Sequence, residues 1–263
     1  MIELRSNKEI EKMKPAGKFV AEVLQTISAN VKPGMNLLDI DDQVRKMIFK
    51  KGATSCYVDY APSFGEGPFA HYICTSVNDA VLHGKPYDYD LVAGDLLSLD
   101  FACSLNGWVA DSATSLVVGS NADSHLVSAE VSHLMKTTED ALKTGIDKAR
   151  AGLRIGDISA AIGDYCRGNG FLVNTEFGGH GVGRVMHGDP HIPNDGKADR
   201  GIRIQPGLVI AIEPWLLMST DEIYIDDVDG WTIRSADGSV GAHYEHTVAV
   251  TESGPVILTA WEK

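Results

Sequence analysis

The sequence predicts an α+β fold in which two related halves form one pseudo-symmetric domain. Three observations predict it: amphipathic helical stretches come in pairs, short apolar stretches typical of β-strands follow them, and three motifs recur in the same order. No low-complexity linker divides the chain, and its 263 residues are enough to bury a sizeable core. We therefore expect residues 1–263 to form a single domain.

The first predicted helix begins at a capping box, Ser6 to Glu9, and ends at residues 31–34, Val-Lys-Pro-Gly. Its apolar residues alternate at spacings of three and four, which is typical of a helix with one buried face. Pro15 is expected to kink this helix or to delay its regular part. Further helices are expected from about Leu38 to Lys50, near Ser124 to Arg150, and near Asp157 to Asn169.

The predicted strands are short, β-branched and apolar, with turn residues on either side. Asn106-Gly107 is a strong signal for a two-residue hairpin, across which Leu105 would pair with Trp108. Residues 61–70 have the composition of a surface loop. The expected strands are Leu96–Phe101, Trp108–Val118, Val209–Glu213 and His243–Val250.

The internal repeat gives both halves the same plan: two helices, a His-Gly-x-Pro motif, then a strand that ends in a carboxylate. Three matches in one order are unlike a chance agreement, so we expect the copies to span roughly residues 7–118 and 124–250. The matched segments are 33–40 with 151–158, 83–86 with 187–190, and 93–100 with 206–213.

The charge balance argues against nucleic-acid and membrane partners. Asp and Glu number 36 against 23 Lys and Arg, a net charge of −13, and such a surface repels phosphate backbones and anionic lipids. The apolar runs are strand-sized and the N-terminus has no signal-peptide core, so we expect a cytoplasmic protein. The four cysteines form no C-x-x-C pair, which favours reduced, packed thiols.

Four carboxylates are candidates for a cation site. In the predicted hairpin Ala102 pairs with Asp111, so Asp100 becomes a diagonal neighbour of Asp111, ~7–8 Å away at the backbone. Two like charges on one buried face require a cation or a proton. Glu213 occupies in the second half the place that Asp100 holds in the first, and Glu245 lies in another predicted strand. Alone, Glu245 would be a hydrogen-bonded or edge residue; with the other three it completes a cluster.

Histidines add to this cluster. His180 lies in a glycine-rich stretch where the backbone can approach a ligand closely, but no phosphate-loop pattern is present. His83 and His187 come from matching His-Gly-x-Pro motifs and should converge on one cleft. The remaining histidines have no such support and are interpreted as surface or packing residues: His71, His125, His133, His191, His243 and His246.

Four carboxylates with imidazoles suit Mn, Fe, Co or Zn in a two-metal arrangement better than a thiolate structural zinc. Two such ions ~3.5–4 Å apart deprotonate a water and polarise a carbonyl. No G-x-S-x-G motif and no recognised Cys-His spacing occurs in the sequence. The site chemistry therefore points to metal-assisted hydrolysis.

At this level of detail the sequence resembles type I methionine aminopeptidases from about residue 3 to residue 260. The resemblance implies the pita-bread fold, with a central antiparallel sheet covered by helices. It also implies a monomeric enzyme with two divalent metal ions that removes the initiator methionine from nascent proteins when the second residue is small. The motifs that carry it are Ser76–Gly84, Leu99-Asp100, Ala110-Asp111, Gly179–Gly183, Ile212–Pro214 and Tyr244–Thr247.

The same resemblance implies roles for individual residues. His83 would contact the scissile amide, His187 the carbonyl oxygen, and Glu213 would accept a proton from the attacking water. Asp111 and Glu245 would bridge the two ions. The implied metal ligands are Asp100, Asp111, His180, Glu213 and Glu245.

The implied methionine pocket is where the sequence departs from the family. Cys74, Met186, Trp231 and the stretch Cys56–Tyr60 would line it. Met186 precedes His187 where an aromatic residue is common, and the loop of residues 61–70 is longer than in many type I members.

Two alternatives remain open at this point. One is another hydrolase of the same fold, such as an Xaa-Pro dipeptidase or aminopeptidase P, although those usually carry a further N-terminal domain. The other is a pita-bread binding module without catalysis, although such relatives lose metal ligands and this sequence keeps all five.

Overall fold

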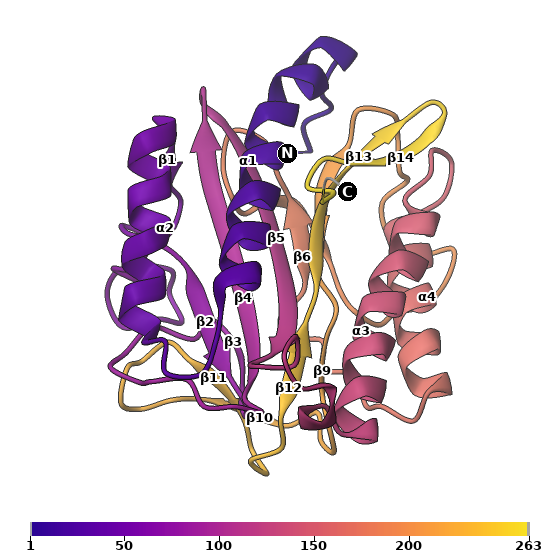
Figure 1. The fold of residues 1–263 in the computed structure, drawn as a ribbon. Coiled ribbons are helices and arrows are strands. Elements are labelled where there is room, and N and C mark those ends of the chain that lie inside the picture. The colour runs from indigo at the N-terminus through magenta and orange to yellow at the C-terminus, as the bar shows by residue number, and fades with distance from the viewer. Residues whose placement is uncertain (1, 262–263) are drawn as a thin grey trace.

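The structure is a computed structural model that describes residues 2–261. Figure 1 shows helices lying over one face of a curved antiparallel sheet, with α1 and α2 over one part and α3 and α4 over another. The predicted α+β class is confirmed. Among the helices of the described residues, none is both long and apolar enough to cross a bilayer.

The helices follow the predicted positions closely. The capping box at Ser6 is present, and α1 continues through Pro15, so its regular part is not delayed. The stretch expected as one helix from residue 124 is instead a 3₁₀ turn (η1, Ser124–Leu126) followed by α3, because Ser128 provides a new N-cap. The α-helices are α1 (Asn7–Asn30), α2 (Leu37–Lys51), α3 (Ala129–Lys148) and α4 (Ile155–Gly168).

The largest sheet has nine strands in the order β1-β4-β5-β13-β8-β6-β7, with β2 paired to β4 and β14 to β13. Its strands are β1 (Thr54–Ser55), β2 (Cys74–Val77), β4 (Leu96–Leu105), β5 (Trp108–Val117), β6 (Gly179–Gly181), β7 (Gly188–Ile192), β8 (Val209–Ile212), β13 (Glu245–Thr251) and β14 (Gly254–Ile257). Two small sheets contain β3 (Ala80–Leu82), β9 (Trp215–Leu217), β10 (Ile223–Ile225), β11 (Ile233–Ser235) and β12 (Gly241–His243).

The predicted hairpin is confirmed in its register. Leu105 pairs with Trp108 and Ala102 with Asp111, so β4 and β5 run antiparallel over ten residues each. Asn106 and Gly107 have φ of 54° and 72°, the positive values that a two-residue turn of this kind requires.

The strand expected from His243 to Val250 is in fact two strands. β12 ends at His243 and pairs with β9, whereas β13 begins at Glu245 and pairs with β8. The break lies opposite Glu213-Pro214, between β8 and β9, where proline has no N–H to donate to a ladder. The Tyr244 N–H donates instead to the Pro214 carbonyl. The stretches β8–β9 and β12–β13 run side by side, and both pass from one sheet to another at this point, next to Glu213 and Glu245.

The alternation of side chains divides the sheet into two faces. On β4, Leu97, Leu99 and Phe101 pack in the core formed with α1 and α2. On β8 and β13, Ile210, Ile212, Val248 and Val250 pack in the core formed with α3 and α4. Asp100, Asp111, Glu213 and Glu245 occupy the alternate positions, so they lie on the face opposite the helices.

Gly17 allows α1 to contact the end of the chain closely. A Cβ at this position would lie 2.2 Å from the carbonyl oxygen of Leu258. We expect Gly17→Ala to lower the free energy of unfolding by about 1–3 kcal/mol, although alanine favours helices. Gly168→Ala is the matched control, because a Cβ on this helical glycine meets nothing within 4 Å. Urea unfolding measures the stability of both variants. Equal losses would show that the close approach of Gly17 to Leu258 does not account for the effect.

Candidate metal centre

Three neighbouring strands bring three carboxylates together. Asp100 on β4 and Glu245 on β13 are both in register with Ala113 of β5, and Asp111 lies two residues along β5 on the same face. Single carboxylate oxygens of Asp100, Asp111 and Glu245 lie within 4.8 Å of one another. Thr247 fixes β5 against β13 because its hydroxyl accepts from the Asp111 N–H at 2.9 Å and donates to the Asp111 carbonyl at 2.8 Å.

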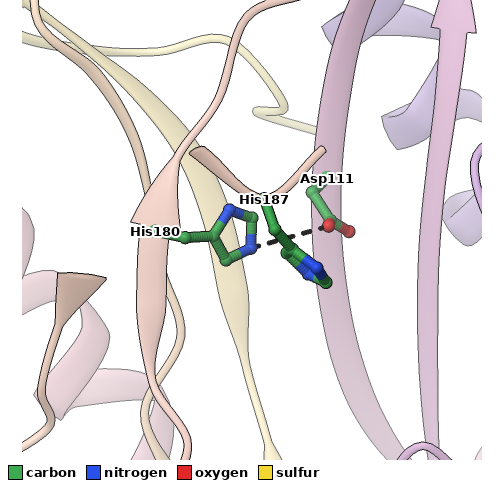
Figure 2. A group of neighbouring side chains, drawn as sticks. All are labelled: Asp111, His180 and His187. Carbon is green, nitrogen blue, oxygen red and sulfur yellow. Dashed lines mark ion pairs between the residues drawn. The ribbon is translucent and has the colours of Figure 1, made fainter. Parts of the chain in front are cut away.

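Glu213 and His180 complete the cluster from the other side. Glu213 directly follows β8, and its Oε1 lies 3.4 Å from Nε2 of His180 on β6. Figure 2 shows the His180 ring directed at Asp111, with its Nε2 3.9 Å from Asp111 Oδ2, and His187 beside them. Ligand atoms of His180, Glu213 and Glu245 form one group within 4.8 Å, and those of Asp111, His180 and His187 form another.

Burial and crowding make this cluster costly without a cation. Burial raises the pKa of Glu213 from 4.5 to about 8 and that of Asp100 from 3.8 to about 6. Burial, together with the neighbouring carboxylates, also raises the pKa values of Asp111 and Glu245 well above their usual range. Oε1 of Glu245 is buried and has no hydrogen-bond partner among the described residues. The site therefore offers carboxylate oxygens and one imidazole nitrogen, without a protein cation to balance the carboxylates among the described residues. Such a donor set fits divalent transition-metal ions.

The predicted site residues line a single cavity. His83 and His187 line it with the five candidate ligands, as do the three residues predicted for the methionine pocket. Its lining side chains are Tyr57, Tyr60, Phe69, Cys74, His83, Asp100, Asp111, His180, Met186, His187, Glu213, Trp231 and Glu245.

Residues 61–70 form the predicted loop and most of them are exposed, but the two phenylalanines of the loop pack inward. Phe69 is buried and lines the cavity, and Phe64 contacts the Trp231 ring edge-to-face at 5.6 Å. The two phenylalanines in this stretch could have indicated inward packing. The prediction of a surface loop rested instead on its glycines and prolines.

Sequence reasoning also missed contacts made by Tyr57 and His243. The Tyr57 hydroxyl donates to Asp100 Oδ1 at 2.6 Å and to Asp111 Oδ1 at 3.4 Å. His243, interpreted as a surface or packing residue, is buried with its Nε2 3.9 Å from Oε2 of Glu213. Its position two residues before Glu245 was the available signal, since such residues share a face of an extended chain.

The raised carboxylate pKa values predict how the metal-free protein responds to pH. Glu213 binds its proton more tightly in the folded state, with a pKa of about 8 against 4.5, so this stabilisation is lost as pH rises through 8. Buried histidines have the opposite effect at low pH: burial lowers the pKa of His180 from 6.5 to about 3, which costs stability below pH 6.5. We therefore expect the free energy of unfolding, measured in urea with a chelator, to fall between pH 6.5 and about pH 9.

Added divalent metal should reduce this loss, since the cation replaces the protons. Glu213→Gln is the control, and it should weaken the pH dependence of the free energy of unfolding of the metal-free protein. A metal-free protein that is equally stable at both pH values would contradict the raised pKa of Glu213.

The comparisons with known proteins agree with a metallopeptidase site. Residues 11–252 match metallopeptidase family M24, and the chain belongs to this family. It is therefore a metal-dependent peptidase.

The similar proteins narrow this class further. The chain is 41% identical over 261 residues to a methionine aminopeptidase of Aquifex aeolicus, covering 98% of both chains. It is 37% identical over 261 residues to methionine aminopeptidase 1 of Bacillus subtilis, covering 98% of this chain and 99% of the relative.

Solved structures identify the fold as the predicted pita-bread fold. The methionine aminopeptidase of Rickettsia prowazekii superposes with a TM-score of 0.92 at 33% identity, covering 99% of this chain and 100% of that chain. The prolidase of Pyrococcus furiosus superposes with a TM-score of 0.74 at 20% identity, covering 99% of this chain and 66% of that one. The second likeness concerns the fold alone.

Proposed function

We propose that this enzyme removes methionine from the N-terminus of peptides and nascent polypeptides when the second residue is small. The observation that carries the proposal is the convergence of four carboxylates and His180 on one cavity that His83, His187 and Trp231 also line. The similarity to methionine aminopeptidases over nearly the whole chain supports the substrate.

We propose that Asp100, Asp111, His180, Glu213 and Glu245 would hold two divalent ions. Asp111 and Glu245 each belong to two groups of ligand atoms that lie within 4.8 Å of one another, one with Asp100 and one with His180. When bound, such ions make a water nucleophilic at neutral pH and polarise a carbonyl. Co, Mn, Fe and Zn all match this donor set.

The chain's own residues then handle protons and charge. Glu213, whose carboxylate lines the cavity beside His180, accepts the proton of the attacking water. His187 donates to the carbonyl oxygen as negative charge develops there. His83 contacts the nitrogen of the scissile amide. Burial lowers the pKa of His83 to about 3, so its ring is neutral at physiological pH.

The proposed methionine pocket is formed by Cys74, Met186 and Trp231 together with Tyr57 and Tyr60. These side chains line the cavity beside the carboxylates and are soft or aromatic, as a thioether requires. A monomer as the active unit is part of the same proposal. We also propose a cytoplasmic location, and the net charge of −13 argues against a nucleic-acid partner.

The test is a peptide assay with defined metal content. The purified protein should release methionine from Met-Ala-Ser only when metal is present, and should cut Met-Gly and Met-Ser peptides far faster than Met-Lys or Met-Phe. An Xaa-Pro peptide is the comparison substrate. Preferential cleavage of Xaa-Pro would replace this proposal with a prolidase-type activity.

Met186 offers a test of specificity within the pocket. We expect Met186→Phe to sharpen the preference for methionine over norleucine and leucine, because a rigid ring replaces a flexible side chain. Shape differences of one methyl group or branch are worth ~1–3 kcal/mol. The measurement is kcat/KM for Met-, norleucine- and Leu-Ala-Ser with both proteins. Unchanged ratios would remove Met186 from the pocket and leave Trp231 and Cys74 to define it.

A further inference from the structure

The two histidines from the His-Gly-x-Pro motifs are held in different ways. Nδ1 of His187 lies 2.7 Å from the Tyr60 hydroxyl, and the two rings meet edge-to-face with centroids 5.1 Å apart. This hydrogen bond leaves Nε2 as the ring nitrogen available to a substrate. A ring nitrogen of His187 lies within 4.8 Å of ligand atoms of Asp111 and His180.

His83 has no such bond. Its Nδ1 is buried and has no hydrogen-bond partner among residues 2–261. Its ring instead stacks on Phe64, with centroids 5.4 Å apart and planes 16° apart, and meets the edge of Phe177 at 5.4 Å. Aromatic packing is therefore what limits rotation of the His83 ring.

Tyr60 and Phe64 belong to one short loop, residues 60–69. The Phe69 N–H donates to the Tyr60 carbonyl at 2.9 Å and closes the loop, and the buried Phe69 side chain anchors it. The Glu66 N–H donates to the Gly230 carbonyl at 3.1 Å. Gly65 lies against the Trp231 indole so closely that a Cβ would be 2.7 Å from Cε2. The loop is thus fixed to the core and to the wall of the cavity.

We propose that residues 60–69 act as a positioning loop for both histidines: the Tyr60 hydroxyl holds His187 in the tautomer protonated at Nε2, and the Phe64 ring fixes the plane of His83. The proposal rests on the proposed function, in which both histidines contact the substrate. It gives this loop a role in the reaction beyond lining the methionine pocket.

The chemistry requires this tautomer. A neutral imidazole has one N–H, so a ring that accepts a hydrogen bond at Nδ1 carries its proton on Nε2. Tyr60 can act as the donor because burial raises its pKa and keeps the hydroxyl protonated. An Nε2–H is a donor already in place for the oxygen on which negative charge develops. The other tautomer would present a lone pair to that oxygen and repel it.

Tyr60→Phe tests the first half of the proposal, because it removes the hydroxyl and keeps the ring. In the Zn²⁺-loaded wild-type protein, ¹⁵N spectra of the histidine side chains should show His187 as the Nε2–H tautomer; in the variant they should show a mixture. With the activating metal, kcat should fall about 10- to 100-fold with little change in KM, as for other orienting partners. Tyr224→Phe, at an exposed tyrosine on β10, is the matched control and should change neither quantity.

Phe64→Leu tests the second half, and Phe64→Tyr is the conservative variant that keeps an aromatic ring. We expect Phe64→Leu to lower kcat about tenfold while Phe64→Tyr retains most of it, with metal content unchanged in both. Phe49→Leu, at an exposed phenylalanine on α2, controls for the loss of an aromatic side chain. Equal losses in Phe64→Leu and Phe64→Tyr would mean that the ring does not position His83.

The outcomes separate this proposal from the proposed function. A wild-type protein that releases no methionine would contradict the function, while the tautomer of His187 would still be measurable. Full activity and an unchanged His187 tautomer in Tyr60→Phe would overturn the role of the positioning loop. If Tyr60→Phe shifts the unfolding midpoint but leaves kcat and the His187 tautomer unchanged, the loop has a purely structural role. That result would also overturn the proposal of a positioning loop.

Discussion

Asp111→Asn is expected to keep the fold but to lose bound metal and to lower kcat/KM for Met-Ala-Ser at least about a thousandfold, or about 4 kcal/mol of transition-state stabilisation. Asp111 is 3% exposed and lies between Asp100 on β4 and Glu245 on β13. An amide of nearly the same shape has no negative charge and a single acceptor oxygen, so it cannot be shared between two cations as a carboxylate is.

The backbone contacts of Asp111 explain why the fold should survive. Its N–H and carbonyl both bond the Thr247 hydroxyl, and neither bond involves the Asp111 carboxylate. Removing one of several crowded carboxylates also relieves repulsion in the metal-free state. The variant should therefore be at least as stable as the wild-type protein when both are compared in chelator.

The measurements are metal content by elemental analysis, steady-state kinetics and urea unfolding. Asp147→Asn, at an exposed position on α3, is the control for the loss of a carboxylate and should behave as the wild-type protein does. If Asp111→Asn binds as much metal as the wild-type protein and turns over normally, Asp111 does not hold an ion, and the metal site proposed here is wrong.

The hairpin was predictable because its determinants are local. The Asn-Gly turn sets the register between β4 and β5, and the period of two then assigns Asp100 and Asp111 to one face. The same alternation, with the internal repeat, indicated that Glu213 belongs to this cluster. Carboxylates that end apolar strands are conspicuous because burial of an unpaired charge is costly.

The features of the fold and of the site that were not predicted depend on contacts between distant parts of the chain. The break at Tyr244 becomes visible only when β13 is placed beside β8, where Pro214 interrupts the partner strand. The stacking of Phe64 on His83 joins a glycine- and proline-rich loop to the end of β3, and no local pattern encodes it. Tyr57 likewise reaches Asp100 across 43 positions of sequence. Local periodicity predicts faces of elements, but it does not predict which loop covers them.

His187→Ala is expected to lower kcat about 10²- to 10³-fold, the usual effect of removing a donor to a developing oxyanion. KM should change little, because the interaction strengthens only in the transition state. Metal stoichiometry should also be unchanged. Metal stoichiometry is the measurement that discriminates best. A His187 ring nitrogen lies within 4.8 Å of ligand atoms of Asp111 and His180, which is close enough for a metal ligand.

Two observations favour a donor role for His187 over a ligand role. His187 is exposed at the mouth of the cavity, whereas His180 is buried beside Glu213. His187 also has the Tyr60 hydroxyl on Nδ1. With Tyr60 as the donor, as proposed above, Nε2 carries the proton and cannot bind a cation without losing it. His125→Ala, at an exposed histidine in η1, is the control. Loss of metal from His187→Ala would make His187 a ligand, whereas full metal content with reduced kcat would place it on the substrate, with a larger loss than in Tyr60→Phe.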